Sequence, residues 1–186
     1  MSVLHELNSL DDAMAYLVAA SFGPHLLSDY EPITAESLSE PYRTLLHHND
    51  HMTAVLYRYH GCAVELRVLQ QSLLHDIYSR FILLTAEGTD EVLETGVVKI
   101  NLELLEEAVR DEIVAGGKPL GNILIDHEVM RRIQPKWYMR LPAGCPLVDP
   151  FGGGVGEAYG RVGVIYCDHQ PAIELLEVVA DVRVGT

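Results

Sequence analysis

Residues 77–84 read Ile77-Tyr78-Ser79-Arg80-Phe81-Ile82-Leu83-Leu84, an apolar strand with one arginine inside it. Side chains alternate between the two faces of a strand, so Arg80 shares its face with Tyr78, Ile82 and Leu84. That apolar face predicts a position in a core. A guanidinium cannot lose its proton inside a protein, and a buried Arg80 therefore needs an anion.

The segment 171–178 has the same pattern with the opposite charge. Glu174 shares its face with Ala172, Leu176 and Val178, so it too is expected to point into a core. A buried cation and a buried carboxylate suggest an enclosed site for a small polar ligand. Two alternatives stay open. Either Arg80 and Glu174 pair with each other as a structural ion pair, or one or both of them lie at a strand edge and are exposed to solvent.

The composition is that of an ordinary globular protein. The chain has 186 residues, of which 48% are hydrophobic and 22% charged, and its formal net charge is −14. This length predicts a single domain over residues 1–186. The acidic surface repels phosphate backbones and anionic lipids, so we expect no nucleic-acid and no membrane partner. An anionic substrate has to be attracted by a local cationic pocket.

Three cysteines, Cys62, Cys145 and Cys167, are widely spaced and form no CxxC motif. Their number and spacing predict reduced thiols rather than disulfides or a zinc site. The first nine residues lack the basic and apolar regions of a signal peptide, and no apolar run has the length of a membrane span. We therefore expect a cytoplasmic protein.

Hydrophobic periodicity predicts helices first and hairpin-linked strands afterwards. Ser9 is expected to cap the first helix, and Gly23-Pro24 to end it. The predicted helices cover residues 10–22, 39–48, 51–59 and 102–115. The predicted strands cover residues 62–70, 77–86, 91–100, 136–141, 157–167 and 171–183. Residues 24–39 and 142–156 are predicted to be loops. This order indicates an α+β protein with an antiparallel sheet.

Isolated motifs for other chemistries are weak. His47 and His51 have the spacing of metal ligands on one helix face, but Asn49-Asp50 breaks the helix, so solvated histidines are the better interpretation. Residues 152–156 are rich in glycine but lack the Lys-Ser/Thr of a phosphate loop. Cys145 has no recognisable base partner. The turn at 118–121 could direct backbone N–H groups at a carboxylate or simply connect two elements.

Five segments in order carry a resemblance to a known family. They are Asn49-Asp50-His51-Met52-Thr53, Tyr78-Ser79-Arg80-Phe81-Ile82-Leu83-Leu84, Gly117-Lys118-Pro119-Leu120-Gly121, Tyr159-Gly160-Arg161 and Ile173-Glu174-Leu175. The series resembles the chorismate pyruvate-lyase family, and in particular its divergent branch outside the ubiquinone-pathway enzymes. The resemblance spans roughly residues 40–180.

The resemblance implies a chorismate lyase-like fold, in which a six-stranded antiparallel sheet carries helices that form flaps over an internal pocket. It implies elimination of pyruvate from chorismate to give 4-hydroxybenzoate, with neither metal nor organic cofactor. Arg80 matches the ligand-binding arginine and Glu174 the buried active-site glutamate, which makes these two the expected catalytic residues. Met52 and Leu120 match positions whose backbone holds the aromatic acid, and Thr53 and Gly121 flank them.

The chemistry suits these residues. Arg80 would bind the ring carboxylate bidentately, and Glu174 would act as an acid or a proton relay near the leaving ether oxygen. Departures from the better-known enzymes concern the pyruvyl carboxylate: Asn122 stands where they carry arginine, and 93–96 lacks their Trp and Gly-Arg. Arg161 is a candidate replacement as a substrate-binding residue, or equally a surface residue.

Two other functions compete with a lyase on chorismate. The same fold serves as the effector domain of some bacterial transcription regulators, which suggests a non-catalytic aromatic-acid binder. Those regulators carry a DNA-binding helix-turn-helix ahead of it, whereas only about 40 residues precede the matching region here. A lyase on a related enolpyruvyl substrate is the third possibility. In each case the expected partner is a small molecule, and the expected state is a monomer or small homo-oligomer.

Overall fold

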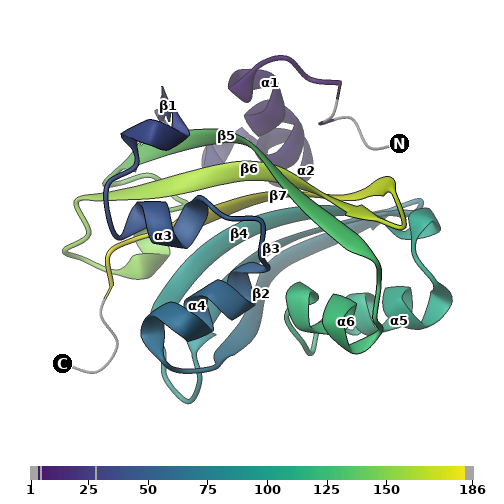
Figure 1. Ribbon diagram of the computed structural model, residues 1–186. Coiled ribbons are helices and arrows are strands. Elements are labelled where there is room, and N and C mark those ends of the chain that lie inside the picture. Colours follow the sequence, from purple (N-terminus) through teal and green to yellow (C-terminus); the bar gives the residue numbers. More distant parts are fainter. Residues whose placement is uncertain (1–3, 5, 28, 183–186) are drawn as a thin grey trace.

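The computed structural model describes residues 4, 6–27 and 29–182. One antiparallel sheet dominates it, with the strand order β1-β5-β6-β7-β4-β3-β2 (Figure 1). The strands are β1 (Glu31–Ile33), β2 (Val64–Leu74), β3 (Ile77–Ala86), β4 (Val92–Asn101), β5 (Arg131–Pro142), β6 (Glu157–Cys167) and β7 (Gln170–Val179). The α+β class is confirmed, but the sheet has seven strands rather than the six expected.

The additional strand comes from a segment predicted to be a loop. Residues 31–33 form β1, which pairs with β5 through Glu31↔Arg140 and Ile33↔Tyr138. Three residues that include Pro32 are too short and too irregular to produce a period-two signal. Arg140 donates hydrogen bonds to Glu31 and Glu157, which stabilises this edge of the sheet.

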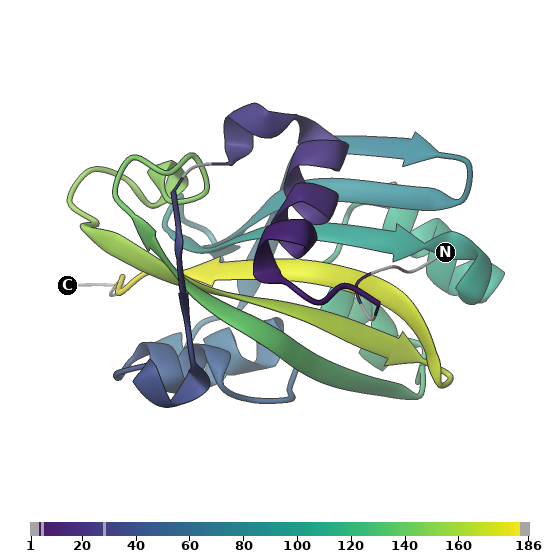
Figure 2. The same cartoon turned by 90° about the horizontal axis from the view of Figure 1, so that it is seen from above.

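Helices cover both faces of the sheet (Figures 1 and 2). One face carries the N-terminal helical segment, which consists of α1 (Leu10–Met14), a π-helical turn (Ala15–Ala19) and α2 (Ala20–Phe22). The opposite face carries α3 (Tyr42–Leu46), α4 (Met52–His60), α5 (Glu107–Ala115) and α6 (Leu120–Asp126). Short 3-10 helices occupy residues 24–26, 35–37, 102–104 and 149–151. We call these two sides the N-terminal face and the α4–α6 face.

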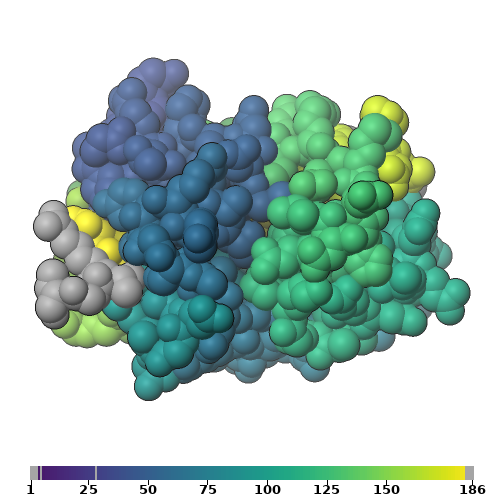
Figure 3. All heavy atoms as spheres, turned by 60° about the horizontal axis from the view of Figure 1, so that its bottom comes forward, coloured from purple at the N-terminus to yellow at the C-terminus, as the bar shows by residue number. Residues whose placement is uncertain are grey.

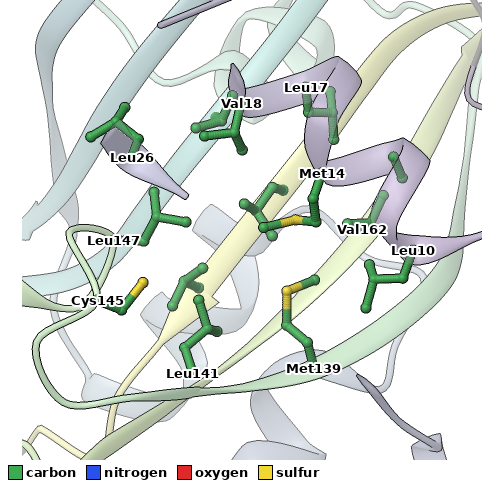
Figure 4. Close-up of a cluster of buried hydrophobic side chains, with 14 of the residues drawn as sticks. Leu10, Met14, Leu17, Val18, Leu26, Met139, Leu141, Cys145, Leu147 and Val162 are labelled. Carbon is green, nitrogen blue, oxygen red and sulfur yellow. The ribbon is translucent and has the colours of Figure 1, made fainter. Parts of the chain in front are cut away.

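The N-terminal face is closed by an apolar cluster (Figure 4). Ser9 caps α1 as predicted, since its Oγ accepts a hydrogen bond from the Asp12 N–H at 3.1 Å. Met14, Leu17 and Val18 of this segment are fully buried against the sheet. Because the sheet is covered on both sides, its central strands are apolar along both faces rather than on one.

Several predicted elements differ in extent from the structure, and two of them begin five residues away from the predicted position. The helix predicted over 102–115 starts with a 3-10 turn at 102–104 and becomes α-helical only at Glu107, because Leu105 and Glu106 have extended backbones. β5 runs over twelve residues, well beyond the predicted 136–141. Within the described part of the chain, no helix is long and apolar enough to cross a membrane.

Candidate functional site

Arg80 lies on β3 and points to the α4–α6 face. The register places Arg80 beside Val98 of β4, and Val98 beside Leu175 of β7, so these three side chains lie on one face. Together with Ile82 they line a cavity between the sheet and the starts of α4 and α6. Arg80 is only 1% exposed. The prediction that its face is buried is confirmed.

The Arg80 guanidinium has unused hydrogen-bond donors. Neither Nε nor Nη1 has a hydrogen-bond partner among the described residues, although both atoms are inaccessible to solvent. Tyr78 on the same strand interacts with Arg80 and donates its own hydroxyl to Gln71 Oε1 at 2.7 Å. A buried donor without an acceptor costs about 1–3 kcal/mol, and more when it is charged. A hydrogen-bond acceptor placed in the cavity beside Arg80 would remove this cost.

The first turns of α4 and α6 form the lid of the cavity. Met52, Thr53, Leu120 and Gly121 all line it, as the resemblance implied. A Cβ added at Gly121 would lie 2.8 Å from Thr53 Oγ1 and 3.0 Å from His51 Cβ. Only glycine therefore permits this close approach of the two helix starts. With the lid closed, the cavity measures about 50 Å³, which is room for about one or two waters.

A buried ion pair lies on the same face, toward the other end of the sheet. Arg161 of β6 donates from Nε to Glu177 Oε2 of β7 at 2.5 Å, and both residues are buried. Arg161 Nη1 also donates to the carbonyl oxygens of Leu46 at 3.0 Å and His48 at 2.8 Å. The pair thus ties the connection between α3 and α4 to the sheet, and Glu177 lines the cavity.

Glu94 is a third buried acid on this face. It lies on β4 opposite Leu84, is 3% exposed, and lines the cavity. Burial raises the pKa of Glu94 well above its usual range, and the neighbouring Glu177 carboxylate raises it further while Arg161 opposes the shift. Its Oε2 has no hydrogen-bond partner within the described chain. Burial without a hydrogen-bond donor for Oε2 among the described residues therefore favours the protonated, uncharged form of Glu94.

A larger cleft of about 880 Å³ opens on the other side of the lid. Figure 3 shows this face, where the blue segment that contains α4 meets the green segment that contains α6 and β5. His51 and Thr53 line both the cleft and the inner cavity. Arg131 Nε donates a hydrogen bond to His51 Nε2 at the boundary. Burial, and then Arg131, lower the pKa of His51 to about 4.

The structure separates Glu174 from this site. Leu175 and Glu177 share the α4–α6 face of β7, so Glu174, at an odd spacing from both, points to the N-terminal face. There it accepts hydrogen bonds from the Tyr16 hydroxyl at 2.7 Å and from the Leu4 N–H at 2.6 Å. Both the shared Arg80–Glu174 site and the direct Arg80–Glu174 pair are thus wrong. The reason is the alternation of side chains along β7, where a shift of one residue moves a side chain to the opposite face of the sheet.

The structure places the other predicted residues as follows. Arg161 is a buried ion-pair residue beside the cavity and not a surface residue. Asn122 lines the outer cleft instead of the inner cavity. His47 and His51 do not converge on a metal site, and no group of three His, Cys, Asp or Glu side chains is placed to hold a metal ion among the described residues.

Sequence reasoning missed Glu94 and Glu177. Glu94 interrupts the apolar β4 as Arg80 interrupts β3, so the same signal was present at Leu93-Glu94-Thr95. Glu177 lies three residues after Glu174, and an odd spacing on a strand places two side chains on opposite faces. A pair of acids at this spacing therefore guarantees that one of them shares the face of Leu175.

Comparisons with known proteins identify a solved structure that has the same fold. No family model matches the sequence, and no curated protein matches it. Among solved structures, PhnF from Mycobacterium smegmatis matches at 11% identity with a TM-score of 0.52, covering 70% of this chain and 64% of PhnF. This chain thus spans less than two thirds of PhnF. The likeness shows that the two proteins share a fold.

Two further matches have lower TM-scores. The effector domain of PhnF matches at 10% identity over 81% of this chain and 91% of that domain, with a TM-score of 0.49. The possible transcriptional regulator YydK from Bacillus subtilis matches at 9% identity over 62% of this chain and 58% of YydK, with a TM-score of 0.44.

The predicted activity as a chorismate pyruvate-lyase is wrong. The solved structure whose fold this chain shares is PhnF, and that name is not the name of a lyase. The geometry agrees, because Glu174, to which we assigned the proton transfer, is bonded to Tyr16 on the opposite face of the sheet.

Proposed function

We propose that this chain is a non-catalytic ligand-binding domain of the effector type, which holds a small aromatic acid in the cavity between the sheet and helices α4 and α6. The observation that carries the proposal is the guanidinium of Arg80, fully buried with Nε and Nη1 lacking partners within the described chain. A carboxylate is the natural occupant, because its two oxygens match two guanidinium N–H groups in a bidentate pair.

Backbone groups of α4 strengthen the carboxylate end of the site. Met52 and Thr53 form the first turn of α4, where N–H groups have no acceptor within the helix. The helix dipole also favours a negative charge there. Thr53 Oγ1 is a further buried group without a partner among the described residues. These donors and Arg80 lie around one cavity and can share a single anion.

The remaining walls suit an aromatic ring. Leucine, isoleucine and valine side chains from five strands surround the space beyond Arg80: Leu66, Ile82, Leu84, Val98, Ile165 and Leu175. Such a ligand would bury its ring on apolar surface and fix its orientation through one charged group. A ring exceeds the closed volume, so binding requires that the starts of α4 and α6 move apart.

The outer cleft provides the route of entry. The chain carries a formal net charge of −14, yet Arg131 and Arg132 line the cleft in addition to the ion pair of Arg58 with Asp50. Local positive charge in a concave surface raises the concentration of anions there. An acid that reaches the cleft lies against His51 and Thr53, which form the wall shared with the inner cavity.

Isothermal titration calorimetry with benzoate tests this function, with an Arg80→Gln variant as the control. We expect saturable binding by the native protein and at least tenfold weaker binding by the variant. We also expect chorismate to release no pyruvate. Equal benzoate affinities for the native protein and the variant would overturn the assignment of Arg80, and absence of benzoate binding would overturn the ligand class.

A further inference from the structure

Glu94 forms a second polar subsite in the cavity, which the carboxylate at Arg80 does not use. We propose that Glu94 donates a hydrogen bond to an uncharged acceptor, such as a carbonyl oxygen, at the far end of the ligand. The ligand class then narrows to aromatic monocarboxylates that carry a neutral acceptor opposite the carboxylate. This inference rests on the proposed function, since it concerns the same cavity.

The register sets the distance between the two subsites. Arg80 pairs with Val98, whereas Glu94 pairs with Leu84 on the same two strands. The two positions are thus four residues apart along β3, or about 13 Å along the strand. Both side chains are long and both line the cavity. Because the two side chains extend from these positions, the spacing between their polar groups is shorter than about 13 Å and admits a ligand with one aromatic ring at most.

Gly96 directs the Glu94 carboxyl group into this gap. Gly96 lies on β4 between Glu94 and Val98 and pairs with Ile82. A Cβ at Gly96 would lie 3.2 Å from Glu94 Oε1 and 3.1 Å from Ile82 Cδ1. The glycine thus leaves the space over β4 into which the carboxyl group folds, along the strand toward Val98 and the Arg80 end.

The surroundings of Glu94 favour its protonated form, in which it is a hydrogen-bond donor. Glu177 of β7 lies near it, and Arg161 of β6 is already committed to Glu177 at 2.5 Å. The other charged or titratable groups that line the cavity are Arg80 of β3 and His51 at the start of α4, and the pKa of His51 is lowered to about 4, which leaves it neutral.

A charge count on these groups defines the ligand. Arg80 and Arg161 contribute two positive charges, Glu177 contributes one negative charge, and protonated Glu94 contributes none. The cavity therefore has one uncompensated positive charge, which a monoanion neutralises. A second carboxylate would face Glu177 and would have to share the one remaining donor group of Arg161, Nη2, with no cation of its own. We therefore expect a dianion to bind more weakly than a monoanion.

Three para-substituted benzoates test the subsite in the intact protein by calorimetry at pH 7. 4-Formylbenzoate has a carbonyl acceptor, 4-vinylbenzoate has nearly the same shape without one, and 4-(aminomethyl)benzoate carries a cation. We expect the native protein to bind the formyl compound about tenfold more tightly than the vinyl compound, as one hydrogen bond contributes about 1 kcal/mol or more. We expect the aminomethyl compound to bind more weakly than either.

Two variants assign that preference to Glu94. Glu94→Gln retains an N–H donor and should retain the preference, whereas Glu94→Leu removes the donor and should bind the formyl and vinyl compounds equally. Two results would overturn the inference about Glu94: equal binding of these two compounds by the native protein, or a preference that survives in Glu94→Leu. The proposed function would still stand in either case, provided that benzoate binds.

Tightest binding of the aminomethyl compound would mean that Glu94 is ionised, which would also overturn the inference. Failure of all benzoates to bind would remove the proposed function and this inference together. If Glu94→Leu does not fold, the native preference and its retention in Glu94→Gln decide the question.

Discussion

Arg80 and Glu174 project from opposite faces of one sheet. Arg80 faces the cavity under α4 and α6, and Glu174 faces the N-terminal helical segment, where it accepts a hydrogen bond from the Tyr16 hydroxyl at 2.7 Å. Lys99 lies over the Tyr16 ring, with its Nζ 3.8 Å from the ring centroid. The charge on each face thus serves a different purpose: Arg80 is available to a ligand, and Glu174 fastens the N-terminal segment to the sheet.

Replacement of Glu174 by Gln should reduce stability and leave binding unchanged. The variant loses the charge on an acceptor of two buried hydrogen bonds, so the free energy of unfolding should fall by about 1–3 kcal/mol. Urea unfolding measures this loss, and benzoate titration of the folded variant measures affinity. Tyr16→Phe is the matched control and should lower stability in the same direction. A large loss of benzoate affinity in Glu174→Gln would contradict the separation of the two faces.

Glu94 should make stability fall as the pH rises. Its pKa is raised in the folded protein, so between the unfolded value of about 4.3 and the raised folded value, the folded state binds more protons than the unfolded state. The stabilising protonation is complete below the unfolded pKa and is lost as the pH rises toward the folded pKa. Unfolding free energies of the native protein and Glu94→Gln should therefore diverge in favour of the variant as the pH rises above the unfolded value. Parallel curves would show that Glu94 is ionised in the fold.

His51 should have the opposite pH dependence. Its pKa is lowered to about 4, mainly by burial, so the unfolded state binds more protons below the unfolded value of about 6.5. Stability from neutral His51 is complete above pH 6.5 and falls as the pH drops toward 4, by at most about 3 kcal/mol. His51→Asn keeps a good helix-capping residue at this position, and its stability should fall less over this window. An equal fall in both proteins would show that His51 is not the titrating group.

Gly121→Ala should strain the lid. A Cβ at this position would lie 2.8 Å from Thr53 Oγ1, and such overpacking typically costs about 1–3 kcal/mol. The gain in helix propensity from Gly to Ala is about 1 kcal/mol, which is too small to compensate. Thermal unfolding of this variant should be compared with Gly117→Ala, where a Cβ would meet nothing within 4 Å. A variant at Gly121 as stable as the one at Gly117 would show that the helix starts are not in tight contact.

The sequence allowed some of these relationships to be predicted and hid others. Alternation within β3 and within β7 correctly identified the faces of Arg80 and Glu174 along their own strands. β4 lies between those strands, and its register determines whether the two faces coincide. Register depends on turn lengths and bulges, such as the shift between Leu84 and Thr85, which periodicity does not reveal.

The lid was predictable for a different reason. Met52 and Leu120 were identified through resemblance, and both lie at helix starts above the cavity. The need for glycine at position 121 appears only in three dimensions, since it depends on the contact with Thr53 and His51. The motifs did not decide the function, because one fold can carry either a catalytic site or a binding site.

If Arg80 binds the ligand, its buried charge lowers the stability of the ligand-free protein. In the Arg80→Met variant, unfolding free energy and benzoate affinity should be measured on the same preparation. We expect that removal of an unpaired buried charge raises the free energy of unfolding of the ligand-free protein by about 1 kcal/mol or more, while benzoate binding is lost. A variant that is less stable than the native protein and still binds benzoate would contradict it.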